Sequence, residues 1–326
     1  MKRSLWSTVA AGAAILTLTL TGCESAESGG SGGGDGDQPY IAIVSKGFQH
    51  QFWQAVKQGA EEAAAEHDVR VTFEGPETET DVDQQIQMLT TALDKNPDAI
   101  ALAALDSQAA APLLERAQSA DIPVIAFDSG VDSDIPVTTA ATDNKAAAAE
   151  AAKHMAEAID GSGKIAIVAH DQTSSSGRDR RDGFVEYMEA NEPDIEIVDT
   201  QYGGGDQLKS TDIANAMIEA NPDLVGIYGT NEGSAVGVVN AVKEKDVVDS
   251  VTVVGFDSSK AQLDAIREGT EFGAVTQNPV GIGRETVEAA VKALAGEDLP
   301  ETIDTGFYWY DKDTIDSEEI KPNLYE

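Results

Sequence analysis

The sequence predicts an α/β fold with two doubly wound parallel-sheet lobes, and two observations carry this prediction. Short apolar runs alternate with amphipathic or alanine-rich stretches from Tyr40 onward, an order typical of parallel strands covered by helices on both faces. The chain also repeats one pattern, over 96–130 and over 221–259: Asn-Pro-Asp, an apolar strand, a polar tip, a helix, a second strand and Phe-Asp-Ser. This period is too long for a solenoid unit and favours two related lobes. The alternative is a chance similarity between α/β units.

Each element follows from its local pattern. Short apolar runs bounded by turn-forming residues predict strands, and longer stretches with one apolar face predict helices. Nine strand and helix pairs are more than one small sheet requires, so we assign them to two lobes. The expected strands are 40–45, 69–74, 98–104, 122–127, 164–169, 195–200, 223–228, 251–256 and 272–276. The expected helices are 51–67, 81–95, 107–120, 144–160, 177–191, 207–220, 232–245, 259–268 and 280–295.

The chain is expected to pass between the lobes at three places, near residues 142, 277 and 307. Each lobe would then have the size of an ordinary domain. The expected N-terminal lobe contains 39–142 and 278–307, and the expected C-terminal lobe contains 143–277 and 308–326.

The N-terminus predicts export and lipid anchoring. Residues 1–22 have a basic start and an apolar run too short to cross a bilayer, which indicates a signal peptide. Leu20-Thr21-Gly22-Cys23 resembles a bacterial lipobox, where cleavage precedes a cysteine that is then lipidated. The alternative is that Cys23, the only cysteine, is an incidental residue of a discarded signal. With the Gly/Ser/Asp-rich linker that follows as far as residue 38, we expect a protein anchored to the extracytoplasmic face of the cell membrane.

Composition and motifs exclude several classes of function. With 58 acidic and 22 basic residues, the net charge of −36 argues against nucleic-acid binding and indicates a solvated acidic surface. The four histidines lack metal-ligand spacing, and the sequence contains neither Gly-x-Ser-x-Gly nor Cys-x-x-Cys. We therefore expect no enzyme activity, no metal and no cofactor.

Two aspartates mark the candidate binding cleft. Asp128 and Asp257 each follow an apolar strand, and ligands of open parallel sheets bind beyond the carboxyl ends of the strands. Two facing lobes would bring both carboxylates into one cleft as hydrogen-bond acceptors. The alternative is that each aspartate only caps the helix that follows it.

Aromatic side chains crowd the junction of the first strand and the first helix. Phe48, Phe52 and Trp53 lie within six positions of a chain that is 6% aromatic. Aromatic faces suit the C–H faces of sugar rings, so these residues indicate a stacking surface. Packing in the hydrophobic core is the alternative for each of them.

Three arginines lie near the start of the helix expected at 177–191. Arg178, Arg180 and Arg181 are cations at the end of a helix where the dipole disfavours positive charge. At least one of them is therefore expected to make an interaction that outweighs this cost. A guanidinium binds vicinal hydroxyls or a carboxylate with paired hydrogen bonds. Compensation by Asp179 and Asp182 in the same turn is the alternative.

The chain from Tyr40 to the C-terminus resembles the ribose/galactose type of periplasmic sugar-binding proteins, which feed ABC importers. The resemblance is carried by QHQFWQAVKQGA, DSQAAAPLLERAQSADIPVIAFDSG, ATDN, SGRDRRDGF, GIYGTNEGSAVGVVNAV, VVGFDSS and AVTQNPVGIG. It implies the type I periplasmic binding protein fold, with a hinge of several strands. It further implies that Phe52 and Trp53 sandwich a sugar ring and that a set of polar residues binds it. These are Asp128, Arg178, Asn231, Asp257 and Gln277, with Gln49 or His50 at the position where ribose binders commonly have asparagine.

Two departures from the family pattern bear on the ligand. Ser129 stands where an arginine often follows the first aspartate, and Ala103 replaces an asparagine that is often found on the preceding strand end. Another pentose, a hexose, a polyol or a related small molecule therefore suits the sequence as well as ribose does.

The resemblance implies a monomeric lipoprotein that captures a sugar-like solute and delivers it to the permease subunits of an ABC transporter. A sensory lipoprotein that presents its ligand-bound form to a signalling partner is the alternative from another class. A sugar-modifying enzyme is disfavoured because no nucleophile or paired acid and base stands out.

Overall fold

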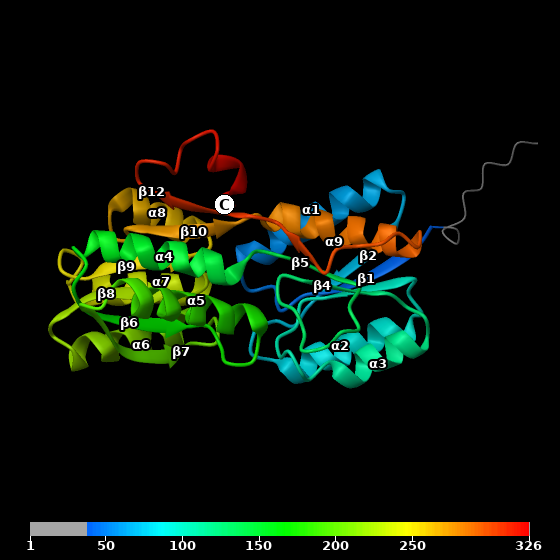
Figure 1. Cartoon of the computed structure of the whole chain (residues 1–326), viewed down its shortest axis with the longest axis horizontal. Helices are drawn as coiled ribbons and strands as arrows, with labels where there is room; N and C mark the ends of the chain where they lie inside the picture. The colour runs from blue at the N-terminus through cyan, green and yellow to red at the C-terminus, as the bar shows by residue number, and fades with distance from the viewer. Residues whose placement is uncertain (1–37, 326) are drawn as a thin grey trace, which may run out of the picture. The chain divides into compact units, whose positions relative to one another are not determined.

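The computed structural model describes residues 38–325 and confirms the two-lobed α/β fold. The predicted signal peptide, Cys23 and most of the predicted linker lie outside the described residues. In Figure 1 the N-terminal lobe is on the right and the C-terminal lobe on the left. No helix within 38–325 is long and apolar enough to span a bilayer.

The N-terminal lobe is built on a six-stranded parallel sheet with the order β11-β5-β4-β3-β1-β2. Alternate residues of its strands face opposite cores: Ile41 and Ile43 pack toward α1 and α9, whereas Ala42 and Val44 pack toward α2 and α3. The strands are β1 (Tyr40–Val44), β2 (Arg70–Glu74), β3 (Ala99–Leu102), β4 (Val124–Phe127), β5 (Thr138–Ala141) and β11 (Thr302–Asp304). The helices are α1 (Gln51–Glu66), α2 (Val82–Asp94), α3 (Ala111–Ser119) and α9 (Pro279–Leu294).

The C-terminal lobe repeats this plan with the order β12-β10-β9-β8-β6-β7. Ile165 and Ile167 pack with α4 and α5, and Ala166 and Val168 pack with α6 and α7. The strands are β6 (Gly163–Ala169), β7 (Ile195–Tyr202), β8 (Leu224–Gly229), β9 (Thr252–Phe256), β10 (Gly273–Gln277) and β12 (Phe307–Asp311). The helices are α4 (Asn144–Ala158), α5 (Ser175–Asn191), α6 (Gln207–Ala220), α7 (Glu232–Glu244), α8 (Lys260–Glu268) and the short η1 (Lys321–Asn323).

Three strands escaped the sequence analysis, and each has a weak signal. β5 reads Thr-Thr-Ala-Ala and β11 has three residues, so neither forms a recognisable apolar run. β12 pairs antiparallel with β10 at the edge of an otherwise parallel sheet, where the alternation of strands and helices gives no guidance. The chain passes between the sheets after β5, β10 and β11, near the three predicted places. The exact lobe boundaries stay a prediction.

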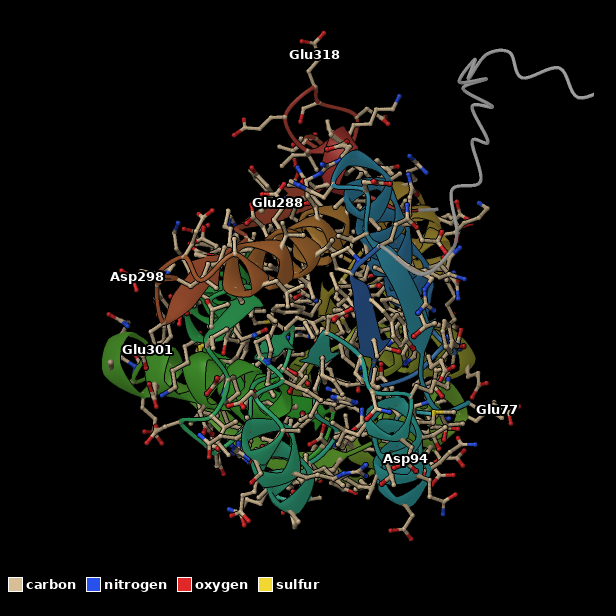
Figure 2. All side chains as sticks on the ribbon, turned by 90° about the vertical axis from the view of Figure 1, so that its right-hand side faces the viewer. Glu77, Asp94, Glu288, Asp298, Glu301 and Glu318 are labelled. Carbon is tan, nitrogen blue, oxygen red and sulfur yellow. The ribbon has the colours of Figure 1, made fainter. Side chains whose placement is uncertain are left out.

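Acidic side chains cover the outer surface, as the charge predicts. Glu77, Asp94 and Glu318 are exposed and project away from the ribbon (Figure 2). Such residues keep their hydration, so the large net charge is carried where it costs little desolvation energy.

Glu271 is an exception, because its side chain is buried beneath β9. One carboxylate oxygen accepts a hydrogen bond from Gln262 Nε2 at 3.3 Å, and the other has no partner among the described residues. Burial raises the pKa of Glu271 to about 8. The fold therefore favours the neutral acid, and the protein loses stability as pH rises from 4.5, the usual pKa, to about 8.

We predict that Glu271→Gln raises the free energy of unfolding at pH 8 by on the order of 1–3 kcal/mol, because it removes this charge. The gain should shrink as pH falls below 4.5, where the wild-type side chain becomes neutral in both states. Urea unfolding at several pH values measures the effect, with the exposed Glu297→Gln as control. A gain that does not depend on pH would contradict the prediction.

Candidate functional site

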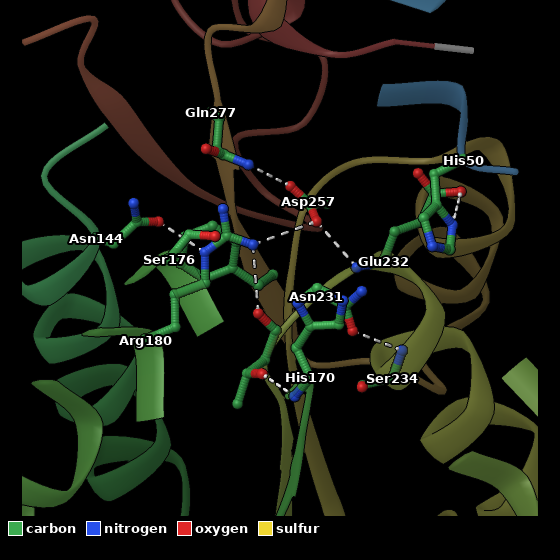
Figure 3. A network of polar contacts seen from close by, with 12 residues as sticks. His50, Asn144, His170, Ser176, Arg180, Asn231, Glu232, Ser234, Asp257 and Gln277 are labelled. Atoms are coloured by element: carbon green, nitrogen blue, oxygen red, sulfur yellow. Dashed lines mark hydrogen bonds and ion pairs between the residues drawn. The ribbon is translucent and has the colours of Figure 1, made fainter. Parts of the chain in front are cut away.

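A buried cavity lies between the lobes, at the carboxyl ends of the strands. Its volume is about 20 Å³, which is room for about one water molecule and far below the roughly 300–1,000 Å³ of pockets that hold drug-sized molecules. The N-terminal lobe contributes Lys46, His50, Phe52, Glu79 and Asp128 to its wall. The C-terminal lobe contributes His170, Ser176, Arg180, Asn231, Glu232, Asp257 and Gln277, all of which are labelled in Figure 3.

The structure brings Asp128 and Asp257 to this one cavity with the same backbone conformation. Both have left-handed backbones, with φ of 54° and 81°. Each also donates its backbone N–H to the next strand, Asp128 to Ala140 and Asp257 to Val275. Few residues except glycine, asparagine and aspartate adopt this conformation readily, and it turns each strand end sharply. The repeated Phe-Asp-Ser motif therefore encodes a repeated turn.

The two aspartates differ in their partners. Asp257 accepts hydrogen bonds from Gln277 Nε2 at 2.8 Å and from the backbone N–H of Glu232 at 2.9 Å. Asp128 has no side-chain hydrogen bond or ion pair within residues 38–325, and burial raises its pKa to about 6. Neither aspartate is the N-cap of the helix that follows it: Ser259 caps α8, and a strand and a long turn separate Asp128 from α4.

A chain of histidines and carboxylates joins the lobes across the cavity. His170 Nε2 lies 2.9 Å from Glu79 Oε2, and His170 Nδ1 lies 2.8 Å from Asp171 Oδ2. His50 Nδ1 lies 3.5 Å from Glu232 Oε1. Because Glu79 and His50 belong to the N-terminal lobe and their partners to the C-terminal lobe, these contacts hold the lobes together.

The charges of this chain reinforce one another. Burial lowers the pKa of His50, but Glu79 and Glu232 outweigh burial and raise it to about 9. Burial likewise raises the pKa of Glu79, yet His50 and His170 bring it well below its usual range. The charged forms therefore stabilise one another in the closed cleft.

The structure separates the roles of the three arginines. Arg180 lies in the cavity wall, where Nε donates to Asn144 Oδ1 at 2.7 Å and the guanidinium lies over the Phe256 ring, 3.9 Å from its centroid. Arg178, our candidate for the ligand-binding guanidinium, lies outside the wall and bridges the lobes through Ser107 and Asp132. Arg181 is compensated by Asp182, as the alternative interpretation expected.

The aromatic pair does not form a sandwich in this structure. Phe52 contributes to the cavity wall. Trp53 is 1% exposed and packs edge-on against Phe52 at 83°, and its Nε1 donates to Glu79 Oε1 at 2.5 Å. The Trp53 ring is therefore part of the core and orients a wall carboxylate. Phe48 packs at a distance from the wall, edge-on to Phe73.

The other predicted ligand-binding residues are divided between the wall and the rim. His50, Asn231 and Gln277 line the cavity, and Gln277 Oε1 is buried without a partner among the described residues. Gln49 is exposed at the rim and donates to the backbone oxygen of Gly205 across the cleft at 3.3 Å.

Besides Arg180, sequence reasoning missed four ionisable residues of the wall: Lys46, Glu79, His170 and Glu232. Lys46 Nζ donates to Ser174 and Ser176 of the other lobe, each at 3.3 Å. Lys46 and His170 carried a usable signal, since each directly follows a predicted strand. Within 38–325 no group of three or more His, Cys, Asp or Glu side chains could hold a metal ion.

Two lobes that enclose a buried polar cavity define a binding protein. A profile of the periplasmic binding protein domain matches residues 41–298, and the chain belongs to this family. This agrees with the resemblance to periplasmic sugar-binding proteins and supports the expectation of a protein that is not an enzyme.

Characterised relatives include sugar-binding proteins. The D-ribose/D-allose-binding protein of Pseudomonas aeruginosa is 27% identical over 269 residues, 80% of this chain and 84% of that protein. An Agrobacterium vitis ABC transporter solute-binding protein with bound D-fucose has 33% identity and a TM-score of 0.85, covering 88% of this chain and 100% of the other. A second A. vitis protein, with bound α-D-tagatopyranose, has 29% identity and a TM-score of 0.86, covering 89% and 100%.

We predict that the closed cleft loosens at alkaline pH. The raised pKa of His50 means that its contribution is complete below 6.5, its ordinary value, and is lost as pH rises through about 9. The loss should be on the order of 1–3 kcal/mol, which favours the open form. Small-angle scattering between pH 6 and 10 should show an expansion that His50→Gln abolishes. The same expansion in both proteins would contradict the assignment to His50.

Proposed function

We propose that this protein captures a monosaccharide or a similar polyhydroxylated solute between its lobes and delivers it to the permease of an ABC importer. The observation that carries the proposal is the convergence of polar side chains from both lobes on one cavity. Family membership and the sugar complexes of the A. vitis proteins support it.

The proposed mechanism is closure driven by contacts that exist only when the lobes meet. A ligand that binds Asp128 in one lobe and Asp257 or Arg180 in the other favours the closed form by its differential affinity. Because the cavity is small and its walls contact each other, the lobes must separate to admit a sugar ring. The proposed ligand set from the sequence keeps Asp128, Asp257, Asn231, Gln277, His50 and Phe52 and takes Arg180 in place of Arg178.

A sensory role remains the second candidate, because the same closure would present a ligand-dependent surface to a signalling partner. Uptake of the identified ligand by cells that lack this protein separates the two. Loss of uptake supports an importer subunit, and intact uptake with a lost transcriptional response supports a sensor.

A thermal-shift screen of sugars and polyols tests the proposed function, and paired substitutions test the site. Asn keeps the left-handed backbone of aspartate but is a weaker, neutral acceptor. Asp128→Asn and Asp257→Asn should each weaken binding about 5- to 150-fold, which is about 1–3 kcal/mol, and Asp128→Asn should not lower stability, because it also removes a buried charge. Calorimetry measures both. Wild-type affinity in both variants would mean that these aspartates are structural.

We also propose that Cys23 is the membrane anchor. Cys23→Ala should release the protein from membranes or leave it unprocessed, since a single tether carries the attachment. Fractionation and the mass of the mature protein measure this, with Ser25→Ala as a control in the linker. Unchanged fractionation and mass in Cys23→Ala would refute lipidation.

A further inference from the structure

Donors and acceptors in the cavity wall are unequally satisfied by the protein. The two permanent cations are engaged: Arg180 with Asn144 and Phe256, and Lys46 with two serine hydroxyls. Among the acceptors, Glu232 Oε2 and Gln277 Oε1 are buried without a hydrogen-bond partner, and Asp128 makes no side-chain hydrogen bond within residues 38–325. The wall donors His50 Nδ1 and His170 Nε2 also lack hydrogen bonds but face carboxylates, Glu232 at 3.5 Å and Glu79 at 2.9 Å. The acceptors that face no cation therefore favour a ligand that supplies donors.

The balance of charge points the same way. Lys46 and Arg180 face four wall carboxylates, Glu79, Asp128, Glu232 and Asp257, and a fifth, Asp171, lies behind His170. With both wall histidines protonated, four cations face the four wall carboxylates, and Asp171 leaves the carboxylates one in excess. His170 lies between Glu79 and Asp171, His50 beside Glu232, and Arg180 Nη1 is 3.8 Å from Asp257 Oδ2. Asp128 is therefore the carboxylate without a cation within ion-pair distance, and Lys46 and Arg180, which lie farther away, offset only part of the effect of burial on its pKa.

A buried carboxylate without a counter-ion is unfavourable, and a ligand cation would remove that penalty. Asp128 is 4% exposed and points into the cavity wall from the N-terminal lobe, and Glu232 is 4% exposed on the C-terminal side. A hydroxyl could donate a hydrogen bond to either of them, but only an ammonium group would also neutralise the buried negative charge.

We propose that the ligand is a polyhydroxylated molecule with a protonated amine, such as an amino sugar or an amino polyol, whose ammonium group binds Asp128. This inference rests on the proposed capture of a sugar-like solute and specifies its charge. The hydroxyls of the same ligand would meet Gln277 Oε1, Asn231 and Lys46.

Matched pairs of compounds that differ only in one amine or hydroxyl test the proposal. The pairs are D-glucosamine and D-glucose, D-galactosamine and D-galactose, D-mannosamine and D-mannose, and 1-amino-1-deoxy-D-sorbitol and D-sorbitol. Calorimetry of the mature protein at pH 7 should show at least one amine that binds ten-fold or more tightly than its hydroxyl twin.

Substitutions then show which residue causes the preference for an amine. Asp128→Asn should reduce the ratio between amine and hydroxyl twin to about three-fold or less, and Glu232→Gln tests the second carboxylate independently. Asp134→Asn removes an exposed charge from the same loop, outside the cavity wall, and should leave the ratio unchanged.

Each outcome decides between the two proposals. Neutral members that bind as tightly as the amines, or an amine preference that survives Asp128→Asn, would overturn this inference and leave the proposed function standing; loss of the preference in Glu232→Gln alone would place the ammonium group at Glu232 instead. Absence of binding by every compound would count against the capture of a sugar-like solute itself.

Discussion

The burial of carboxylates between the lobes is the constraint on which the rest of this structure depends. Left-handed turns after β4 and β9 aim Asp128 and Asp257 into a space from which bulk water is largely excluded. Charges in such a place need partners, and the nearest side chains lie on the opposite lobe. The pairing of Glu79 with His170 therefore satisfies a buried charge and holds the lobes together at once.

The same side chains that would bind a ligand bind each other in this closed form. A cavity of about 20 Å³ leaves space for little more than one water, so ligand entry must separate Lys46 from the serines of α5 or Glu79 from His170. A ligand shifts the equilibrium only by the amount that its contacts exceed these internal ones. A solute whose contacts with the wall are weaker than these internal contacts therefore does not stabilise a ligand-bound closed form.

Sequence periodicity was sufficient for the two-lobed fold, apart from the strands β5, β11 and β12, and for part of the site. The two Phe-Asp-Ser turns lie at strand ends, where topology alone dictates that a ligand cleft forms. Glu79 gave no such signal, since it lies in an acidic loop that resembles the solvated surface and becomes a wall residue only through Trp53 and His170.

The choice between Arg178 and Arg180 was equally inaccessible from the sequence. Side chains that are two positions apart on a helix point to nearly opposite sides of it. Only the orientation of α5 therefore decides which arginine faces the cleft.

The two lobes share a backbone plan, and their electrostatics have diverged. Asp257 is held by Gln277, the N-terminus of α7 and the more distant Arg180, so its orientation and charge are fixed without a ligand. Asp128 has the same turn but no hydrogen-bond partner, and Lys46 and Arg180 act on it only from beyond ion-pair distance. Ser129, which follows it, contacts Ser175 of the other lobe through its hydroxyl. An aspartate that is already compensated positions a ligand with little regard to charge, whereas an uncompensated one rewards a cation. The same turn therefore occurs twice in the cleft with two different roles. Asp257 is an acceptor that positions the ligand, and Asp128 is an acceptor that distinguishes ligands by their charge.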